Sequence, residues 1–379
     1  MIDTYVFVYS VYTLICYVLA IVLNNYKLKG KRTKILLIAL MAIGALIAAI
    51  RPENTQDTGI YNSIYQDSLI YSDDTSVFDI QELFGNRIVG GIEMFYILIM
   101  GYFRNYFDSP VIFYFVQGFL SNILMVKGLY LLYENIVDRK EETDSLNSRK
   151  AIIIYALYQM FCGVLYTSSA IRDGLSISIG IFSIANLLSK KRELLAYVLL
   201  VFSVLVHTTS IIFFPIYSVL LIGKRDIRKN AILLMSLLIP VLYFLRIGAV
   251  FVGGFVLFFE KVLALLNINF FVSYLNLLNY QLPYREGVIV VLTSAILAII
   301  SVSGEKIIKN TASYIMLVFI GLLIMVSAYP IPAVVRFVYI FILFLVPVVA
   351  RMELNANAVY IVWSLLFVPQ FIYVFGYFL

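Results

Sequence analysis

The sequence predicts an all-α polytopic membrane protein, and its composition and its apolar runs are the two observations that predict this class. Of the 379 residues, 62% are hydrophobic and 13% are charged, whereas a soluble domain is about one half apolar and about one quarter charged. The mean hydropathy is +0.96. Apolar runs separated by short charged segments fill the chain, so we expect residues 1–379 to form a single transmembrane domain of about 12 helices, within a range of about 11–14.

The apolar runs are each about long enough to cross a bilayer. The predicted spans are residues 4–24, 34–50, 110–133, 151–167, 172–188, 230–246, 286–302, 311–328, 334–350 and 357–376, together with two short spans within 193–222. Basic clusters bound 193–222 on both sides, and such clusters favour the cytoplasmic face. One helix cannot begin and end on the same side of a membrane, so we expect a helical hairpin there with its outer tip at 207–210.

Charge sets the predicted orientation. A basic cluster follows the first apolar run and consists of Lys27, Lys29, Lys31, Arg32 and Lys34. Cytoplasmic loops are usually basic, so this loop is predicted to lie inside and the N-terminus outside. The long stretches 51–109 and 246–285 are then outer loops. Their apolar segments 91–107 and 249–266 are short or bracketed by charge, which favours outward-facing interfacial or re-entrant helices over spans.

Other partner and cofactor classes find no support in the sequence. The formal net charge of +6 is explained by basic cytoplasmic loops, so it indicates no nucleic acid. Cys16 and Cys162 lie inside apolar runs and give neither a disulfide framework nor metal-ligand spacing. With one histidine in the chain, we expect no dedicated metal site and no cofactor.

Arginine dominates the predicted outer side. The outer bases are Arg51, Arg87, Arg104, Arg172, Arg246, Arg285 and Arg336, with Lys261 as the lysine among them. Arginine offers a planar fork that matches phosphate and stays charged when partly desolvated. Several of these residues lie at span ends, which predicts an anion site for a lipid-linked phosphate or pyrophosphate. The structural alternative is that they snorkel and pair with nearby acids, such as Asp173 beside Arg172.

His207 is the histidine of the chain and is followed by Thr208, Thr209 and Ser210 at the predicted outer tip. A lone histidine in a helical protein is commonly a structural hydrogen-bonding group. Its predicted depth near the arginines also supports a second interpretation, in which the neutral imidazole accepts a proton from a sugar hydroxyl. Both interpretations stay open at this point.

Acids and tyrosines supply further candidates on the outer side. Asp57, Glu93 and Asp173 are alternative catalytic bases. Asp57 could instead cap a helix that begins near residue 60, and Glu93 could complement the N-terminal dipole of a helix. Tyr61 and Tyr65 are candidates to stack on sugar rings, although an aromatic belt at the membrane interface explains them equally well.

Several features on the predicted outer side occur together in a characteristic order. They are Arg51, Asp57 and Tyr61 after a short span, Glu93 with Phe95, Ile171-Arg172 at a span start, His207-Thr208-Thr209-Ser210, and Arg336 with Tyr339. This order resembles the EpsG-like branch of the Wzy-type polysaccharide polymerases, over residues from about 1 to 350. The resemblance implies a multi-pass protein of the bacterial inner membrane with a fold related to the GT-C glycosyltransferases.

The resemblance also implies an activity. The protein would be a metal-independent glycosyltransferase that joins undecaprenyl-pyrophosphate-linked repeat units into O-antigen of lipopolysaccharide, capsule or exopolysaccharide, with its active site facing the periplasm or exterior. Arg172 and Arg336 would bind pyrophosphate first, followed by Arg51, Arg285 and Arg246. Tyr61, Tyr65 and Tyr339 would contact sugars. Implied partners are the lipid-linked glycans, membrane lipids and a chain-length regulator protein.

Two other functions use similar ligands. An O-antigen ligase-like glycosyltransferase would take the same donor and transfer the glycan to another acceptor. A flippase for lipid-linked oligosaccharides, which is not an enzyme, would require charged residues deep in opposed spans. Lys127 is nearly the only charge predicted at mid-span, so the sequence favours an enzyme over the flippase.

Overall fold

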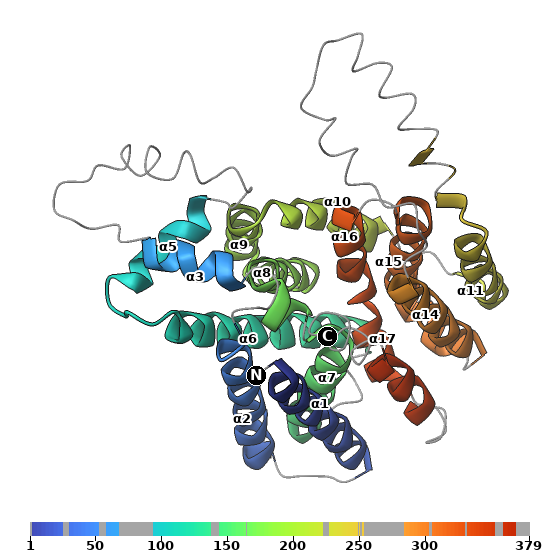
Figure 1. Ribbon diagram of the computed structural model, residues 1–379. Coiled ribbons are helices and arrows are strands. Elements are labelled where there is room, and N and C mark those ends of the chain that lie inside the picture. The colour runs from blue at the N-terminus through green and yellow to red at the C-terminus, as the bar shows by residue number, and fades with distance from the viewer. Residues whose placement is uncertain are drawn as a thin grey trace. The chain divides into compact units, whose positions relative to one another are not determined.

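A computed structural model describes most of the chain (Figure 1). The described residues are 2–25, 30–52, 58–67, 94–137, 144–163, 165–222, 227–248, 250, 252–253, 284–302, 305–329, 332–352 and 359–368. Every regular element among them is a helix, as the sequence predicts. The chain divides into two compact units, Met1–Pro215 with Gln370–Leu379 and Ile216–Pro369, and each is treated separately below.

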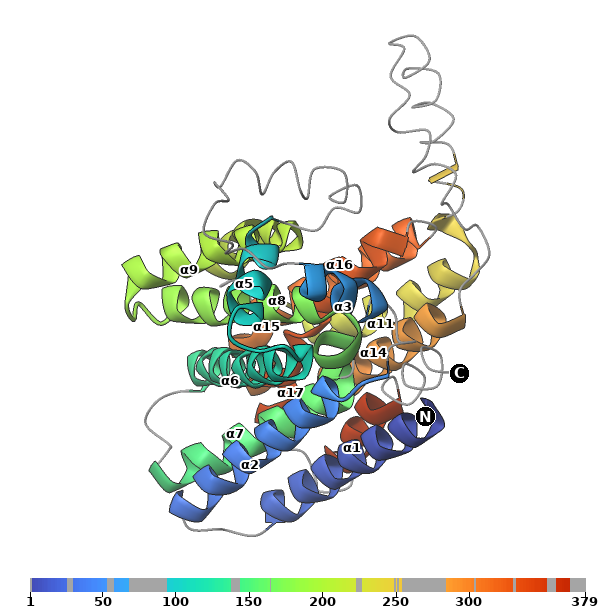
Figure 2. The same ribbon diagram turned by 60° about the vertical axis from the view of Figure 1, so that its left-hand side comes forward.

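The first unit holds the helices that surround the candidate site (Figure 2). They are α1 (Ile2–Asn25), α2 (Gly30–Ala49), α3 (Thr58–Asp67), α5 (Met94–Arg104), α6 (Pro110–Ile136), α7 (Asp144–Tyr158), the π-helical turns η2 (Gln159–Gly163) and η3 (Leu165–Ser169), α8 (Ile171–Leu188), α9 (Glu193–Val206) and the 3-10 turn η4 (Thr208–Ile212). Helix α10 (Phe213–Ile222) continues from the first unit into the second.

The second unit contains α11 (Lys229–Phe244), α14 (Tyr284–Val302), α15 (Glu305–Ala328), α16 (Pro332–Ile342) and α17 (Leu345–Arg351). Helix α11 packs on α14, and α15 packs on α16. A Cβ atom added at Gly321 of α15 would lie 2.6 Å from the Cβ of Phe341. This glycine therefore permits the close packing of α15 and α16, as small residues do between membrane helices.

Among the described residues, five helices are long and apolar enough to cross a membrane. They are Thr4–Asn25, Lys31–Ala49, Pro110–Ile136, Ile171–Leu188 and Thr311–Ala328. Shorter apolar helices of 10–17 residues accompany them in the described part of the chain. Apolar side chains also remain exposed, for example Phe7, Leu14 and Val18 on α1, as lipid-facing side chains would be. The all-α membrane class is thus confirmed, while the count of about 12 spans and the GT-C likeness stay predictions.

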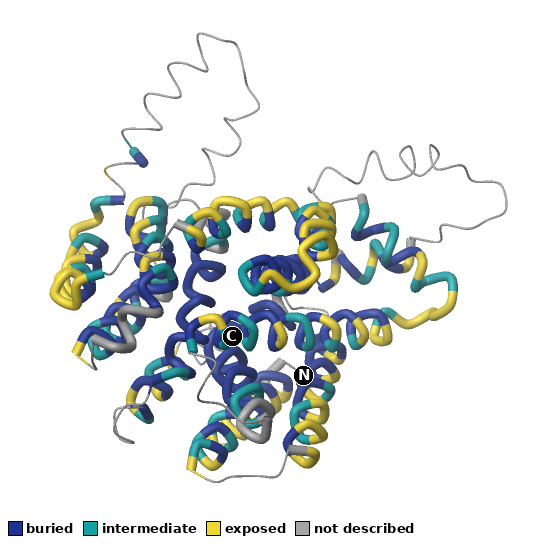
Figure 3. The backbone as a smooth tube through the Cα atoms, turned by 180° about the vertical axis from the view of Figure 1, so that it is seen from behind, coloured by how far each residue is buried: buried dark blue, intermediate teal, exposed yellow. Residues whose placement is uncertain are grey.

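Helix α8 is the most enclosed of these candidate spans, and 83% of its residues are buried. Figure 3 shows its backbone almost continuously in the colour of buried residues. It packs against α6 and α9. A Cβ atom at Gly128 of α6 would lie 2.8 Å from the backbone nitrogen of Phe182, and one at Gly180 would lie 2.2 Å from the ring of Phe213. Glycines on and around α8 therefore allow its neighbours to approach closely.

Contacts at both ends of α6 and α8 show that these two helices run parallel. Near their starts, Gln117 of α6 bonds the backbone of Ile171. Near their ends, Lys191 lies 3.7 Å from a carboxylate oxygen of Glu134. Parallel directions are what the predicted alternation of spans requires, because both helices are predicted to run from outside to inside. The basic residues after α8 thus lie at the opposite end of the unit from its first turn.

Residues 166–174 connect the predicted spans 151–167 and 172–188 and are less exposed than a polar connection between spans usually is. The backbone stays helical through η2 and η3, and Tyr166, Thr167 and Asp173 are buried. The polar groups are tolerated because they bond inside the unit: the Tyr9 hydroxyl donates to Gln159 Oε1 at 3.1 Å and lies 3.3 Å from Thr167 Oγ1. Such π-helical turns are frequent at functional sites.

The two predicted outer loops are only partly described. Within 51–109, α3 and α5 are helices, and α5 lies inside the predicted interfacial segment 91–107. Within 246–285, most of the predicted segment 249–266 lies outside the described residues. The interfacial placement of both segments, like the single-domain organisation, stays a prediction.

Candidate functional site

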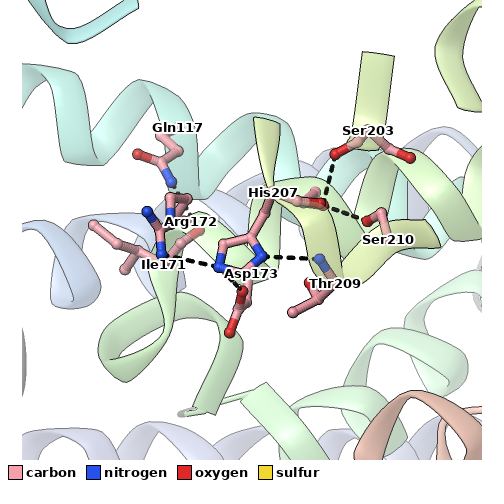
Figure 4. Close-up of polar contacts among 9 residues, drawn as sticks. Gln117, Ile171, Arg172, Asp173, Ser203, His207, Thr209 and Ser210 are labelled. Atoms are coloured by element: carbon pink, nitrogen blue, oxygen red, sulfur yellow. Dashed lines mark hydrogen bonds and ion pairs between the residues drawn. The ribbon is translucent and has the colours of Figure 1, made fainter. Parts of the chain in front are cut away.

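Three of the predicted site residues meet where α8 begins and α9 ends. The Nε2 atom of His207 lies 2.8 Å from Oδ1 of Asp173 and 2.9 Å from Nη2 of Arg172. Figure 4 shows the guanidinium and the carboxylate on the same nitrogen of the imidazole ring. Arg172 and His207 are partly exposed, whereas Asp173 is 6% exposed. Arg172 and His207 are 35 positions apart in the chain, and together with Asp173 they form a single cluster.

His207 holds its position because it ends one helix and begins the next turn. Its backbone is extended, with φ −157° and ψ 129°, and its N–H donates to the carbonyl oxygen of Ser203 at 3.0 Å. Its side chain then caps η4, since Nδ1 accepts a hydrogen bond from the backbone N–H of Thr209 at 3.1 Å. The ring is thus fixed through Nδ1, and Nε2 points to Arg172 and Asp173.

A serine of α8 ties the two helices together. The Ser176 hydroxyl lies 2.9 Å from the carbonyl oxygen of Ser203 and 3.3 Å from that of His207, and it also contacts the hydroxyl of Ser210. Ser176 lies about one turn from Arg172 and Asp173 along α8. These hydroxyl contacts hold α8 against the break between α9 and η4.

Gln117 of α6 supports the first turn of α8 from the other side. Its Nε2 donates to the carbonyl oxygen of Ile171 at 2.8 Å, and its Oε1 accepts from the hydroxyl of Tyr96 at 2.7 Å. Gln117 is not among the site residues predicted from the sequence. Its signal was present all the same, because an amide inside an apolar span needs a partner and so marks a position of interest.

Gly174 allows the chain before α8 to fold against its first turn. A Cβ atom at this position would lie 1.9 Å from the carbonyl oxygen of Tyr166. No side chain fits at that distance, so glycine is needed for the close approach. The glycine therefore helps to set where Arg172 and Asp173 lie relative to η3.

Arg51 is a buried base of the first unit and is 7% exposed. Its Nε donates to Oγ1 of Thr58 at 2.6 Å, and its guanidinium carbon lies 4.1 Å from the centre of the Tyr114 ring. Its Nη2 has no hydrogen-bond partner within the described ranges. Tyr114 belongs to the same apolar cluster as Ile171, so Arg51 lies beside the aromatic support of the α8 start.

The two tyrosines predicted to contact sugars in this unit are packed into that cluster. Tyr61 and Tyr65 are 5% and 0% exposed, and their rings contact Tyr96 and Phe113, respectively. The pKa of the Tyr65 phenol is raised, because the effect of burial outweighs the opposite effect of the nearby Arg104. The phenol therefore stays a donor, and it bonds the carbonyl oxygen of Phe107 at 2.8 Å. In this structure both rings stabilise α3 and α5, and stacking on a sugar stays a prediction.

The remaining predicted site residues are spread over the chain. Asp57 and Glu93 lie outside the described residues. In the second unit, Arg246 is exposed and follows α11 with a left-handed φ of 56°. Three further residues belong to helices of that unit, Arg285 in α14 and Arg336 and Tyr339 in α16. Tyr339 is buried, at 1% exposure.

The Arg172, Asp173 and His207 cluster combines groups with complementary chemistry. The guanidinium can bind an anionic oxygen, and the carboxylate can accept a proton or a hydrogen bond from a hydroxyl. The imidazole contacts both groups. Across the described residues, His, Cys, Asp and Glu side chains do not gather in groups of three that could hold a metal ion. The cluster suits a reaction between a hydroxyl group and an anionic leaving group.

Comparison with known proteins gives one match. A family model described as EpsG family matches residues 34–379. The match includes most of α2 and every later helix of the candidate site. A search of curated proteins and a search of solved structures each found no match.

Proposed function

Because the chain belongs to the EpsG family of Wzy-like polysaccharide polymerases, we propose that it joins oligosaccharide repeat units carried on a lipid pyrophosphate into a longer polysaccharide. The observation that carries this proposal is the cluster in which Arg172 and Asp173 meet His207. The carrier is proposed to be undecaprenyl pyrophosphate. The product is then O-antigen, capsule or exopolysaccharide, made at the outer face of the bacterial inner membrane.

The proposed reaction moves a growing glycan from its lipid pyrophosphate to a sugar hydroxyl of the next repeat unit. Pyrophosphate is a good leaving group, so the protein mainly positions it and stabilises the charge that develops on it. Arg172 takes this role first because its guanidinium is partly exposed at the start of α8 and stays charged. Arg336 is assigned the same role, with Arg51, Arg285 and Arg246 as further ligands. Arginines that carry this charge make a metal unnecessary.

The proposed orientation places the cluster on the outside. The start of α8 lies at one end of the first unit, and the basic residues after α8, including Lys191, lie at the other end near Glu134. Basic ends of membrane helices favour the cytoplasm. The cluster would therefore face the side on which the lipid-linked repeat units are joined.

Loss of the pyrophosphate ligands tests the proposal. Arg172→Ala and Arg336→Ala should abolish long chains while single repeat units persist, as read from the ladder of chain lengths on a gel. Arg192→Ala is a matched control, because Arg192 is an exposed arginine at the basic end of α8, and it should give a normal ladder. Normal ladders in both site variants would overturn the proposal. Long glycan left on the carrier lipid would instead indicate a ligase.

A further inference from the structure

We infer that Asp173 is the group that accepts the proton of the attacking sugar hydroxyl, and that His207 is a positioning residue rather than the base. The inference rests on the proposed polymerase function and assigns roles within its site. It follows from three contacts of the His207 ring: Thr209 on Nδ1, and Arg172 and Asp173 on Nε2.

The contact with Thr209 selects the tautomer of His207. A neutral imidazole has one nitrogen that accepts and one that donates. Nδ1 accepts from the backbone N–H of Thr209 at 3.1 Å, so the ring proton must be on Nε2. A ring protonated on both nitrogens would direct Nδ1–H against that backbone N–H. The fold of the α9–η4 break therefore selects the tautomer of His207 that carries its proton on Nε2, next to Asp173.

This tautomer excludes His207 as the base at Nε2. A protonated Nε2 has no free lone pair. It can therefore neither take a proton from a substrate hydroxyl nor accept a hydrogen bond from Arg172. The guanidinium nitrogen of Arg172, 2.9 Å away, and the carboxylate of Asp173 both lie beside Nε2, and only the carboxylate can accept its proton. The arrangement that satisfies the most contacts has Thr209 on Nδ1 and Asp173 beside Nε2–H. The guanidinium of Arg172 lies beside the same ring nitrogen, where it would hold an anionic oxygen of the substrate.

Asp173 keeps unused capacity to accept. The residue is 6% exposed, and within the described part of the chain its buried Oδ1 has no hydrogen bond of standard geometry, although Nε2 of His207 is 2.8 Å away. A carboxylate oxygen can accept more than one hydrogen bond, so the contact with His207 leaves room for a second donor. An incoming hydroxyl group would provide that donor, and Arg172 next in sequence would hold the anionic leaving group on the same turn.

The chemical step then balances. The acceptor hydroxyl gives its proton to Oδ1 of Asp173, and its oxygen forms the new bond to the anomeric carbon of the donor glycan. The bond from that carbon to the pyrophosphate oxygen breaks, and its electron pair leaves with the lipid pyrophosphate beside Arg172. His207 donates from Nε2 to the carboxylate and orients it before the proton moves.

Conservative variants of His207 show whether its side chain acts as a hydrogen-bond donor or as the catalytic base. An Asn side chain places its oxygen near the position of Nδ1, and a Gln side chain places its amide nitrogen near that of Nε2. The experiment uses the full chain in lipid nanodiscs, with lipid-linked oligosaccharides extracted from host cells that lack the protein. We expect Asp173→Asn to slow polymer formation by about 100-fold or more. We expect His207→Gln to remain within about tenfold of the wild-type rate and His207→Asn to fall well below it.

Chemical rescue guards against a purely structural effect. Formate should restore polymer formation to Asp173→Ala, because the small carboxylate can occupy the vacated space and accept the proton, and it should not restore Arg172→Ala. Provided that the wild-type protein polymerises the extract, two results would overturn the inference. One is a wild-type rate in Asp173→Asn, and the other is a His207→Gln variant as slow as Asp173→Asn. Failure of wild type to polymerise the extract would count against the proposed function itself.

Discussion

Gln117 donates a hydrogen bond from its side-chain amide to the carbonyl oxygen of Ile171, 54 residues later in the chain, at a distance of 2.8 Å. Ile171 directly precedes Arg172, so this bond fixes the backbone from which the candidate site projects. The amide oxygen of Gln117 in turn accepts from Tyr96. One glutamine therefore links α5 and α6 to the first turn of α8.

Replacing Gln117 by Leu should lower both stability and activity. The substitution leaves the Ile171 carbonyl and the Tyr96 hydroxyl without this partner, and such a loss costs about 1–3 kcal/mol. The melting temperature of the purified protein and the length of its polymer should both fall. Gln66→Leu is the control, because Gln66 is exposed and bonds only weakly to Asp108 at 3.4 Å. Equal melting temperatures for the two variants would contradict the prediction.

Gly174→Ala should destabilise the protein more than a glycine substitution in open space. The new Cβ would lie 1.9 Å from the carbonyl oxygen of Tyr166, which forces backbone to move. Overpacking of this kind costs about 1–3 kcal/mol or more. Gly253→Ala is the matched control, since nothing lies within 4 Å of its added Cβ. Thermal unfolding of both variants checks the prediction, and similar melting temperatures would argue against a close approach at residue 174.

Arg172→Lys should retain only part of the activity. Lysine keeps the positive charge but loses the planar fork that bonds two phosphate oxygens at once. A lost hydrogen bond to a charged group is worth about 1.5–3 kcal/mol, which corresponds to a rate lower by about tenfold or more. The initial rate of polymer formation measures this effect. A lysine variant as fast as wild type would mean that charge alone is required at residue 172.

Arg51 and Thr58 should be energetically coupled. The buried Nε of Arg51 donates to the Thr58 hydroxyl at 2.6 Å. Thr58→Val should therefore cost about 1–3 kcal/mol, because it leaves a buried donor of a cation without its acceptor. In the Arg51→Met background the same substitution should cost much less. A double-mutant cycle of unfolding free energies measures the difference, and additive effects would show that the two side chains act independently.

Cysteine labelling should place the C-terminal end of α8 and the C-terminal end of α9 on opposite sides of the membrane. Cys16 and Cys162 are buried, so wild type should react little with a maleimide that cannot cross membranes. Thr208→Cys should be labelled from outside in intact spheroplasts, and Lys190→Cys only after the membrane is opened. Both positions are exposed in the structure. The reverse pattern would invert the predicted orientation.

Much of the fold was predictable because hydropathy and charge are properties of short segments. The apolar runs predict α1, α2, α6, α8 and α15, which are long and apolar enough to cross a membrane in the part of the chain that the structure describes. The basic clusters predict the parallel directions of α6 and α8, and their end contacts agree with this. The ordered motifs from Arg51 to Arg336 resemble the EpsG family, and the family match confirms that resemblance.

Residues 166–174 show where the sequence was insufficient. By sequence alone, this polar stretch with an adjacent arginine and aspartate is typical of an exposed turn. Its burial depends on distant partners, because the Tyr9 hydroxyl contacts side chains 150 and 158 positions away in the chain. No local pattern encodes such a pairing, and the same is true of the contact that Gly174 permits with the backbone of Tyr166.

The sequence by itself determined the membrane class, the family, and the identity of Arg172, Asp173 and His207 as candidates. Tertiary structure decided that these three side chains meet, and that the ring of His207 is held by Thr209 through Nδ1. The physical reason is that hydropathy acts on each segment independently. The distance between α8 and the end of α9, in contrast, depends on side-chain packing and on the hydroxyl contacts of Ser176 across the two helices.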